Sequence, residues 1–282
     1  LLRRHNDRKK IVTERKEYKF MATYYDLVII GAGPGGYTAA IKGASFGMKV
    51  AVVDEKKIGG TCVNRGCIPT KALLHASNIF SMMQHGDEFG VSTDFISFDF
   101  AKMQDYKKRS VRRYRGEIQK LFDKNNITFI KGKATIRREK TIEVVGENGK
   151  EYLRAKNIII ATGSSVFMPP FLALEGENHL LTSTEALDLD QVPASVTVIG
   201  GGVIGVEFAY LLNRLGSKVT VLELMDHILP MVDIEVSRLA EKRMTKDGIL
   251  FRLGAKVSRV KDDTVYYEFG GQNCQVKSDM VL

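Results

Sequence analysis

The chain contains few of the residues that characterise several protein classes. Its 282 residues include no tryptophan, only six prolines and only three cysteines. Three cysteines exclude the dense disulfide framework of small secreted domains, and 26 glycines without a triplet period exclude a collagen-like chain. No apolar run approaches the ~20 residues of a membrane-spanning helix. The composition, 44% hydrophobic and 27% charged, indicates a globular chain long enough for two domains.

The formal net charge of +9 is confined to two segments. Residues 1–20 carry a net charge of +5 and residues 102–120 a net charge of +6, so all other residues together carry −2. We interpret residues 1–20 as a disordered basic leader or as non-native sequence, with a targeting leader as the alternative. The second segment is expected to form a helix with a solvated basic face, or a docking surface for an acidic partner. Nucleic-acid binding is disfavoured because the positive charge lies in a tail and a single helix. In addition, the basic residues do not alternate with aromatic residues in the way that is typical of base stacking.

The strongest organisational signal is an internal repeat with an offset of 169 residues. In each copy an apolar strand is followed by a glycine-rich turn, a helix, a second strand and an acidic residue. The matched positions are Gly31 and Gly200, Gly33 and Gly202, Gly36 and Gly205, Ala40 and Ala209, and Gly47 and Gly216. Each copy ends at an acid, Asp54 or Glu223, 23 residues after its first glycine. The pattern predicts two β-α-β units, and therefore an α/β fold with two Rossmann-like, three-layer dinucleotide-binding domains.

The glycine spacing is that of turns that bind a dinucleotide. The first glycine permits the tight turn, the second lets a pyrophosphate approach the backbone, and the third lets helix and strand pack closely. The phosphates would lie at the helix N-terminus, and Asp54 and Glu223 would accept hydrogen bonds from ribose hydroxyls. Glycine turns without a ligand are the alternative, which the duplicated context disfavours. A carboxylate at Glu223 repels a 2′-phosphate and no Arg or Lys follows within residues 224–230, so the second site favours NAD over NADP.

Apolar periodicity and turn residues predict the remaining elements. A linker-like segment at residues 166–170 places a domain boundary near residue 167, which gives a first domain of residues 21–167 and a second of residues 168–282. The predicted helices are 70–85, 101–123 and 234–248, and the predicted strands are 127–136, 141–146, 151–163, 249–260 and 264–269.

Cys62 and Cys67 form a third candidate site. In a regular helix their spacing would place the two thiols on different faces and the Cα atoms beyond disulfide reach. If they pair, the backbone must distort between them; Gly66 is placed to allow this, and Pro69 fits the first turn of a following helix. Such a bond would be accessible and reducible. Two buried free thiols are the alternative, and a zinc site is disfavoured because no second Cys or His pair lies at a suitable spacing. Cys274 is interpreted as structural.

Taken together, these motifs resemble the pyridine nucleotide–disulfide oxidoreductase family. The resemblance covers residues 24–282 and rests on GAGPGG at 31–36, GGTCVNRGCIPTKALLH at 59–75, ATGS at 161–164 and GGGVIGVEFA at 200–209. Within the family, GCIPTKALLH is most similar to the dihydrolipoyl dehydrogenases. Glutathione and trypanothione reductases instead carry two lysines after the proline and an NADP-binding Arg in place of Glu223. Mercuric reductases and transhydrogenases are the alternatives inside the family.

The resemblance implies FAD in the first site, NAD in the second and a redox-active disulfide between Cys62 and Cys67. Cys62 would be the thiol that exchanges with substrate, and Cys67 the thiol next to the flavin. Lys71 would lie near the flavin and pair with Glu207, where a cation stabilises negative charge on the reduced flavin; a surface lysine is the alternative. The implied FAD-binding residues are Gly31, Gly33, Gly36, Asp54, Thr61, Lys71, Ala134, Thr162, Gly163 and Ser164. The implied NAD-binding residues are Gly200, Gly202, Gly205, Glu207, Glu223 and Val257. No metal site is expected.

The resemblance also implies partners and an incomplete chain. Expected partners are the lipoyl domains of 2-oxo acid dehydrogenase or glycine cleavage complexes, with a homodimer for the full-length protein and no nucleic acid or membrane. A redox-active cysteine pair without a signal peptide fits the cytoplasm. The family's later T-x-x-A-x-G-D segment and its dimerisation domain with a catalytic His–Glu pair have no match. We therefore expect a C-terminally truncated enzyme whose residues 1–282 alone retain FAD weakly and do not turn over lipoamide; a non-catalytic nucleotide-binding fragment is the alternative.

Overall fold

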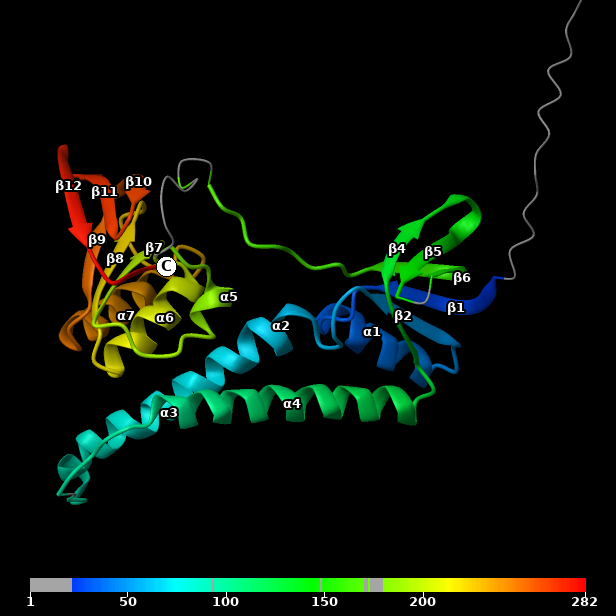
Figure 1. Ribbon diagram of the computed structural model, residues 1–282, viewed down its shortest axis with the longest axis horizontal. Helices are drawn as coiled ribbons and strands as arrows, with labels where there is room; N and C mark the ends of the chain where they lie inside the picture. Colours follow the sequence, from blue (N-terminus) through cyan, green and yellow to red (C-terminus); the bar gives the residue numbers. More distant parts are fainter. Residues whose placement is uncertain (1–21, 93, 148, 170–171, 173–179) are drawn as a thin grey trace, which may run out of the picture.

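The computed structural model describes residues 22–92, 94–147, 149–169, 172 and 180–282 (Figure 1). The expected leader, residues 1–20, and the last residue of the predicted linker, residue 170, lie outside this range. The first unit contains, in order, β1 (Thr23–Ile30), α1 (Pro34–Ser45), β2 (Val50–Asp54), α2 (Gly60–Arg65), α3 (Cys67–Gln84), η1 (Gly86–Phe89), α4 (Phe100–Lys124), β3 (Thr128–Lys131), β4 (Lys133–Ile136), η2 (Arg138–Lys140), β5 (Thr141–Gly146) and β6 (Gly149–Ile160). The second unit contains α5 (Ser183–Ala186), β7 (Ser195–Ile199), α6 (Val203–Arg214), β8 (Lys218–Glu223), α7 (Ile234–Lys246), β9 (Leu250–Leu253), β10 (Lys256–Lys261), β11 (Thr264–Phe269), β12 (Gln272–Lys277) and β13 (Met280–Val281).

The first unit has three layers because both faces of its parallel strands are apolar. Its sheet has the order β3-β2-β1-β6-β5-β4, and β3, β2, β1 and β6 run parallel. Ile29 and Val52 point to a core shared with α1, α2 and α4, whereas Val28 and Val53 point to a second core shared with β5 and β6. All four of these side chains are fully buried. Successive residues of each continuous apolar strand therefore pack alternately into the cores on the two faces of the sheet.

The second unit repeats this arrangement. Its parallel sheet has the order β13-β7-β8-β9, and β10, β11 and β12 form a separate antiparallel sheet. Val198 and Val221 face the helical core, and Leu222 faces the core under β10 and β11. The predicted α/β class with two Rossmann-like units is thus confirmed.

The repeat continues beyond the β-α-β units with a changed offset. Thr141 opens β5 and Thr264 opens β11, a separation of 123 residues rather than 169. The difference arises because the first unit inserts α2, α3 and α4 where the second has only α7. The predicted strand 127–136 is divided at Gly132, since β3 pairs with β2 and β4 pairs with β5. A side chain at Gly132 would meet Val144 Cγ1 at 2.7 Å, so glycine permits this change of partner.

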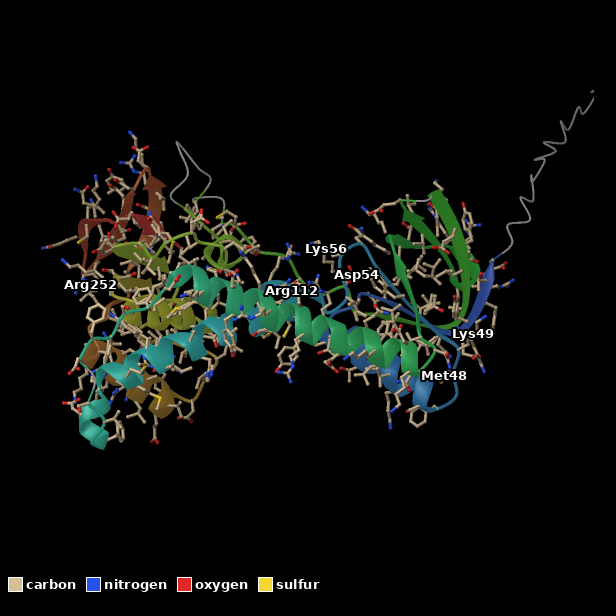
Figure 2. All side chains as sticks on the ribbon, turned by 60° about the horizontal axis from the view of Figure 1, so that its bottom comes forward. Met48, Lys49, Asp54, Lys56, Arg112 and Arg252 are labelled. Carbon is tan, nitrogen blue, oxygen red and sulfur yellow. The ribbon has the colours of Figure 1, made fainter. Side chains whose placement is uncertain are left out.

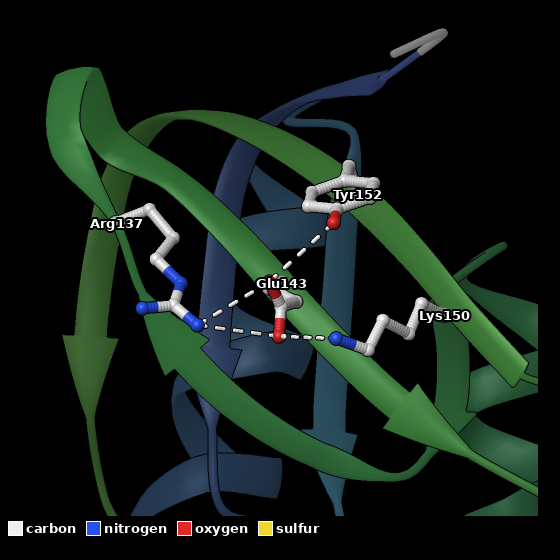
Figure 3. A network of polar contacts seen from close by, with 4 residues as sticks. All are labelled: Arg137, Glu143, Lys150 and Tyr152. Atoms are coloured by element: carbon white, nitrogen blue, oxygen red, sulfur yellow. Dashed lines mark hydrogen bonds and ion pairs between the residues drawn. The ribbon is translucent and has the colours of Figure 1, made fainter. Parts of the chain in front are cut away.

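A polar network ties the β-meander of the first unit together (Figure 3). Glu143 on β5 accepts hydrogen bonds from Arg137 Nη2 at 3.3 Å and from the Tyr152 hydroxyl at 3.4 Å, and its Oε1 lies 3.6 Å from Lys150 Nζ. The hydrogen bond from Arg137 is the main reason that the pKa of Glu143 lies below its ordinary value. One carboxylate thus connects the segment before β5 to the strand after it.

Helix α3 joins the two units. It packs against α4 and α6, and Leu73 of α3 shares a buried cluster with Phe208 and Leu211 of α6. In Figure 1, α4 runs from beneath the second unit to beneath the first. Lys107 of α4 is only 4% exposed; its ammonium donates to Leu187 O at 2.5 Å and to Asp188 Oδ1 at 2.6 Å. The segment expected to present a solvated basic face therefore also contributes a buried cation.

Among the helices in the described residues, none is both long and apolar enough to cross a membrane.

Replacing Phe122 with alanine is expected to lower the free energy of unfolding by about 3–5 kcal/mol, because the fully buried ring fills the core between α4 and the first sheet. Leu121→Ala is the matched control, since that neighbouring side chain is 41% exposed and its loss should cost much less. Urea denaturation followed by circular dichroism measures both. Equal losses for the two variants would contradict this packing.

Candidate nucleotide and disulfide sites

The turn between β1 and α1 requires glycine for steric reasons. Gly31 has a φ of +108°, and a Cβ there would lie 2.1 Å from Ala161 O. A Cβ on Gly36 would lie 1.8 Å from Gly31 O. The equivalent Gly205 is equally constrained, because its Cβ would lie 2.1 Å from Gly200 O. Gly31, Gly36 and Gly205 therefore permit close backbone contacts that a Cβ would prevent, whereas Gly200 is required by its φ of +107°.

The second glycine of each motif faces open space at a helix N-terminus. Gly33 and Gly202 are the N-caps of α1 and α6, and neither helix has a capping side chain or an acidic residue in its first turn. A Cβ on Gly202 would meet no atom within 4 Å, and one on Gly33 would meet only Gly60 Cα at 3.8 Å. Uncapped N–H groups above open space suit a pyrophosphate. The two turns therefore fit the dinucleotides that the sequence predicted.

Asp54 and Glu223 are oriented by the same pair of backbone hydrogen bonds in the two units. Asp54 Oδ2 accepts from Ala32 N–H at 2.7 Å and Oδ1 from Lys56 N–H at 2.8 Å. Glu223 Oε2 accepts from Gly201 N–H at 2.5 Å and Oε1 from Met225 N–H at 2.7 Å. Each donor in the second unit is the 169-residue counterpart of a donor in the first. Both carboxylates are thus fixed beside their glycine turns, with lone pairs left for ribose hydroxyls.

Other predicted residues of the first site gather around the same turn. Thr162, Gly163 and Ser164 follow β6, and Thr162 N lies 3.0 Å from where a Gly31 Cβ would be. Thr61 is the second residue of α2 and follows Gly60, whose own Cβ would lie 2.5 Å from Gly33 Cα. The remaining predicted residue, Ala134 in β4, packs against the cluster that contains Val53, the residue before Asp54.

Val257 in the second unit lies near Glu223 through the backbone. Ala255 N–H donates to Glu223 O at 2.8 Å, and Val257 follows two residues later in β10. Its side chain packs against the core under the antiparallel sheet, which also includes Leu222. The structure thus places Val257 beside the end of β8, where Glu223 lies.

The backbone breaks between Cys62 and Cys67. Helix α2 ends at Arg65, Gly66 has φ −146° and ψ −113°, and α3 begins at Cys67. The new helix is anchored by Thr70, whose N–H and hydroxyl donate to Gly66 O at 3.0 and 2.8 Å. The structure holds both cysteines as free thiols, Cys62 half-buried and Cys67 exposed. The break brings together two thiols that a continuous helix would separate.

The surroundings of Cys62 disfavour its thiolate form. Burial raises the pKa of Cys62 to about 11, assisted by the hydrogen bond to Cys67 and by the charge of Cys67, while the positive charge of Lys71 opposes the shift. Burial and the charges of both cysteines also raise the pKa of Tyr37. Sequence reasoning missed Tyr37; the only signal was its position directly after the third glycine.

Lys71 and Glu207 meet across the two units. The Lys71 ammonium donates to Glu207 Oε1, with side-chain exposures of 59% and 25%. Lys71 lies on α3, which begins at Cys67, and Glu207 lies on α6, which follows the glycine turn of the second unit. Within the described part of the chain, no group of three His, Cys, Asp or Glu side chains is placed to hold a metal ion.

Comparisons with known proteins agree with this geometry. The chain is 40% identical over 260 residues to a dihydrolipoyl dehydrogenase of Bacillus subtilis, covering 91% of this chain and 57% of the relative. It is 39% identical to that of Acholeplasma laidlawii, covering 93% and 78%, and 45% identical to that of Manduca sexta, covering 84% and 48%. The chain thus spans about half the length of most of these relatives.

A solved structure shares the fold. The Cu(II) complex of the HOCl-induced flavoprotein disulfide reductase RclA from Escherichia coli superposes with a TM-score of 0.77 at 29% identity, covering 92% of this chain and 56% of that one. The family model described as pyridine nucleotide-disulphide oxidoreductase matches residues 25–282. Membership of that family implies FAD and a pyridine nucleotide as cofactors, in agreement with the two glycine turns. The chain belongs to the pyridine nucleotide-disulphide oxidoreductase family.

Proposed function

We propose that these residues form the nucleotide- and disulfide-bearing part of a dihydrolipoyl dehydrogenase, which oxidises protein-bound dihydrolipoamide with NAD+. The observation that carries the proposal is the helix break at Gly66, which brings Cys62 and Cys67 together beside the first glycine turn. Support comes from the relatives, several of which are dihydrolipoyl dehydrogenases. The lipoyl domains of 2-oxo acid dehydrogenase or glycine cleavage complexes would be the partners, and the full-length enzyme would act as a homodimer in the cytoplasm.

The cysteines would act by two thiol–disulfide exchanges. A dihydrolipoamide thiolate attacks Cys62 Sγ of the oxidised pair, which forms a mixed disulfide and releases Cys67 as a thiolate. The second thiolate of the same substrate then attacks the substrate sulfur of the mixed disulfide. This attack closes the lipoamide ring and releases Cys62. Because the pKa of Cys62 is raised to about 11, its thiolate is a poor leaving group, and its release requires the sulfur to take up a proton as it leaves. Two electrons thus pass from substrate to the pair; one substrate proton ends on Cys62 and the other is released to solvent, because Cys67 remains a thiolate.

The electrons would then pass from the cysteine pair to the cofactors held in the two nucleotide sites. FAD, held by the first turn, Asp54 and the residues after β6, would accept the electron pair and supply hydride to the nicotinamide. Glu223 would bind the ribose hydroxyls and repel a 2′-phosphate, which favours NAD. Lys71, fixed by Glu207, would present a cation between the two units.

The redox role is tested by anaerobic titration of the FAD-loaded full-length protein, which contains these residues, with dihydrolipoamide. The visible absorbance of the flavin should bleach and then return on addition of NAD+. Cys62→Ser and Cys67→Ser should each abolish the bleaching, whereas Cys274→Ser, in a strand of the second unit, should leave it unchanged. Equal bleaching in all variants would show that substrate electrons bypass the pair, and bound flavin that never bleaches would reject this substrate.

The acidity of Cys62 should respond in opposite directions to its two neighbours. Cys67→Ala removes a hydrogen bond and a charge that raise the pKa of Cys62, so that pKa should fall toward the ordinary value of about 8.5. Lys71→Met removes a cation that favours the thiolate, so the pKa of Cys62 should rise further. Iodoacetamide labelling of the reduced protein across the alkaline range, resolved by peptide mass spectrometry, measures both. Shifts of the same sign in the two variants would refute the assignment.

Glu223→Gln should relax the preference for NADH over NADPH by about tenfold, which corresponds to ~1.4 kcal/mol, because it removes the repelling charge while retaining an oxygen that can accept from Gly201 N–H. Calorimetric titration with each nucleotide measures the ratio. Asp54→Gln, the counterpart in the first unit, should not change it. An unaltered ratio of the NADH and NADPH affinities in Glu223→Gln would show that the 2′-position of the bound nucleotide does not lie beside Glu223.

A further inference from the structure

A cavity of about 350 Å³ opens between α2, α4 and the segment that contains α5. Its volume lies within the ~300–1,000 Å³ typical of small-molecule sites. Asn64 and Pro69 contribute to one wall, and Thr184 and Leu187 to another. Neither cysteine and no residue of the two glycine turns lines the cavity, although Asn64 and Arg65 share α2 with Cys62, so the cavity adjoins the disulfide segment without including it.

Besides the buried Lys107, four cationic side chains line this cavity, and we call them the cavity cations: Arg65, Lys108, Arg112 and Arg115. Lys108, Arg112 and Arg115 are spaced four and three residues apart, so they lie on one face of α4. Arg65 comes from α2, across the cavity. Figure 2 shows Arg112 in the middle of α4, between the two units.

In the described part of the chain the cavity cations are not held in ion pairs, although the charge of Arg65 is one of the smaller causes that lower the pKa of Glu185 in α5. By contrast, Lys102 and Lys120 of α4 pair with Asp99 and Glu117. The one carboxylate that lines the cavity, Asp188, is paired with Lys107 at 2.6 Å. Like charges spaced i, i+4 along a helix repel each other, and an anion between them would relieve that repulsion.

The walls of the cavity are fixed before any ligand arrives. The buried Lys107 ammonium holds Leu187 O, and Gln104 Nε2 donates to Leu189 O at 2.9 Å. These bonds set the distance between α4 and the α5 segment. A preformed site loses little entropy on binding, which favours a compact ligand.

We propose that this cavity binds a small, multiply charged anion, with a diphosphate or a tricarboxylate as the two sources of that chemistry. Guanidinium groups bind either one through paired N–H donors, and three of the four cavity cations are arginines. The volume of the cavity suits a ligand of this size, which the four converging cations would neutralise.

Calorimetric titration of the whole chain with pyrophosphate and with citrate tests the proposal, with FAD and NAD+ in excess so that both glycine turns are occupied. The test variant is Arg112→Gln with Arg115→Gln. The matched control is Arg109→Gln with Arg113→Gln, which removes the same charge from the same helix outside the cavity. The test variant should weaken binding at least tenfold, and the control less than twofold. Tighter pyrophosphate than citrate identifies a phosphate-bearing ligand, and the reverse order a carboxylate; either supports the site.

Three results would overturn the proposal. Equal weakening in both variants would indicate diffuse attraction to the helix, and no binding of either anion would leave the cavity without this function. A heptaglutamate peptide that binds while both small anions do not would assign the face to an acidic protein segment. Lys108→Gln, a single exposed substitution, serves as a second variant if the double variant melts at a lower temperature than the control.

Discussion

The close approach of one backbone to another in the two glycine turns is the constraint on which the structure depends. At Gly36 and Gly205 the peptide of the turn contacts the first helical turn where no Cβ fits, which sets helix and strand close together. The same geometry leaves the N-terminal amides of α1 and α6 uncapped and places the acidic ends of β2 and β8 beside them. Cofactor sites and fold therefore arise from one local packing requirement, used twice.

The two units differ in what is inserted into a common plan. The second unit keeps a single helix, α7, between its second and third strands, whereas the first inserts α2, α3 and α4. That insertion carries Cys62 and Cys67, provides the packing against α6 and contributes the cavity cations. The duplicated core thus serves nucleotide binding, and the inserted helices add the thiols and the contacts between units.

Sequence reasoning predicted those parts of the fold that short-range patterns determine. The glycine spacing and the acids at Asp54 and Glu223 marked both turns, and the Cys62–Cys67 spacing indicated that pairing of the two cysteines would require a backbone distortion, which Gly66 is placed to allow. Those patterns could not predict the packing between segments that lie far apart in the sequence. The burial of Lys107 depends on Leu187 and Asp188, eighty residues away, so a basic sequence segment could not reveal it. The influence of the thiols on Tyr37 likewise depends on how α1 and α3 meet.

Helix α3 is also a mechanical element. Its 18 residues span ~27 Å, with Cys67 at one end and, along its length, Lys71 and Asn78 bonded to Glu207 and Arg214 of α6. A helix of this length behaves as a stiff rod. A tilt of the second unit would therefore act on the helix that carries the exposed thiol at its end, so the orientation of one unit and the position of a sulfur atom in the other are geometrically linked.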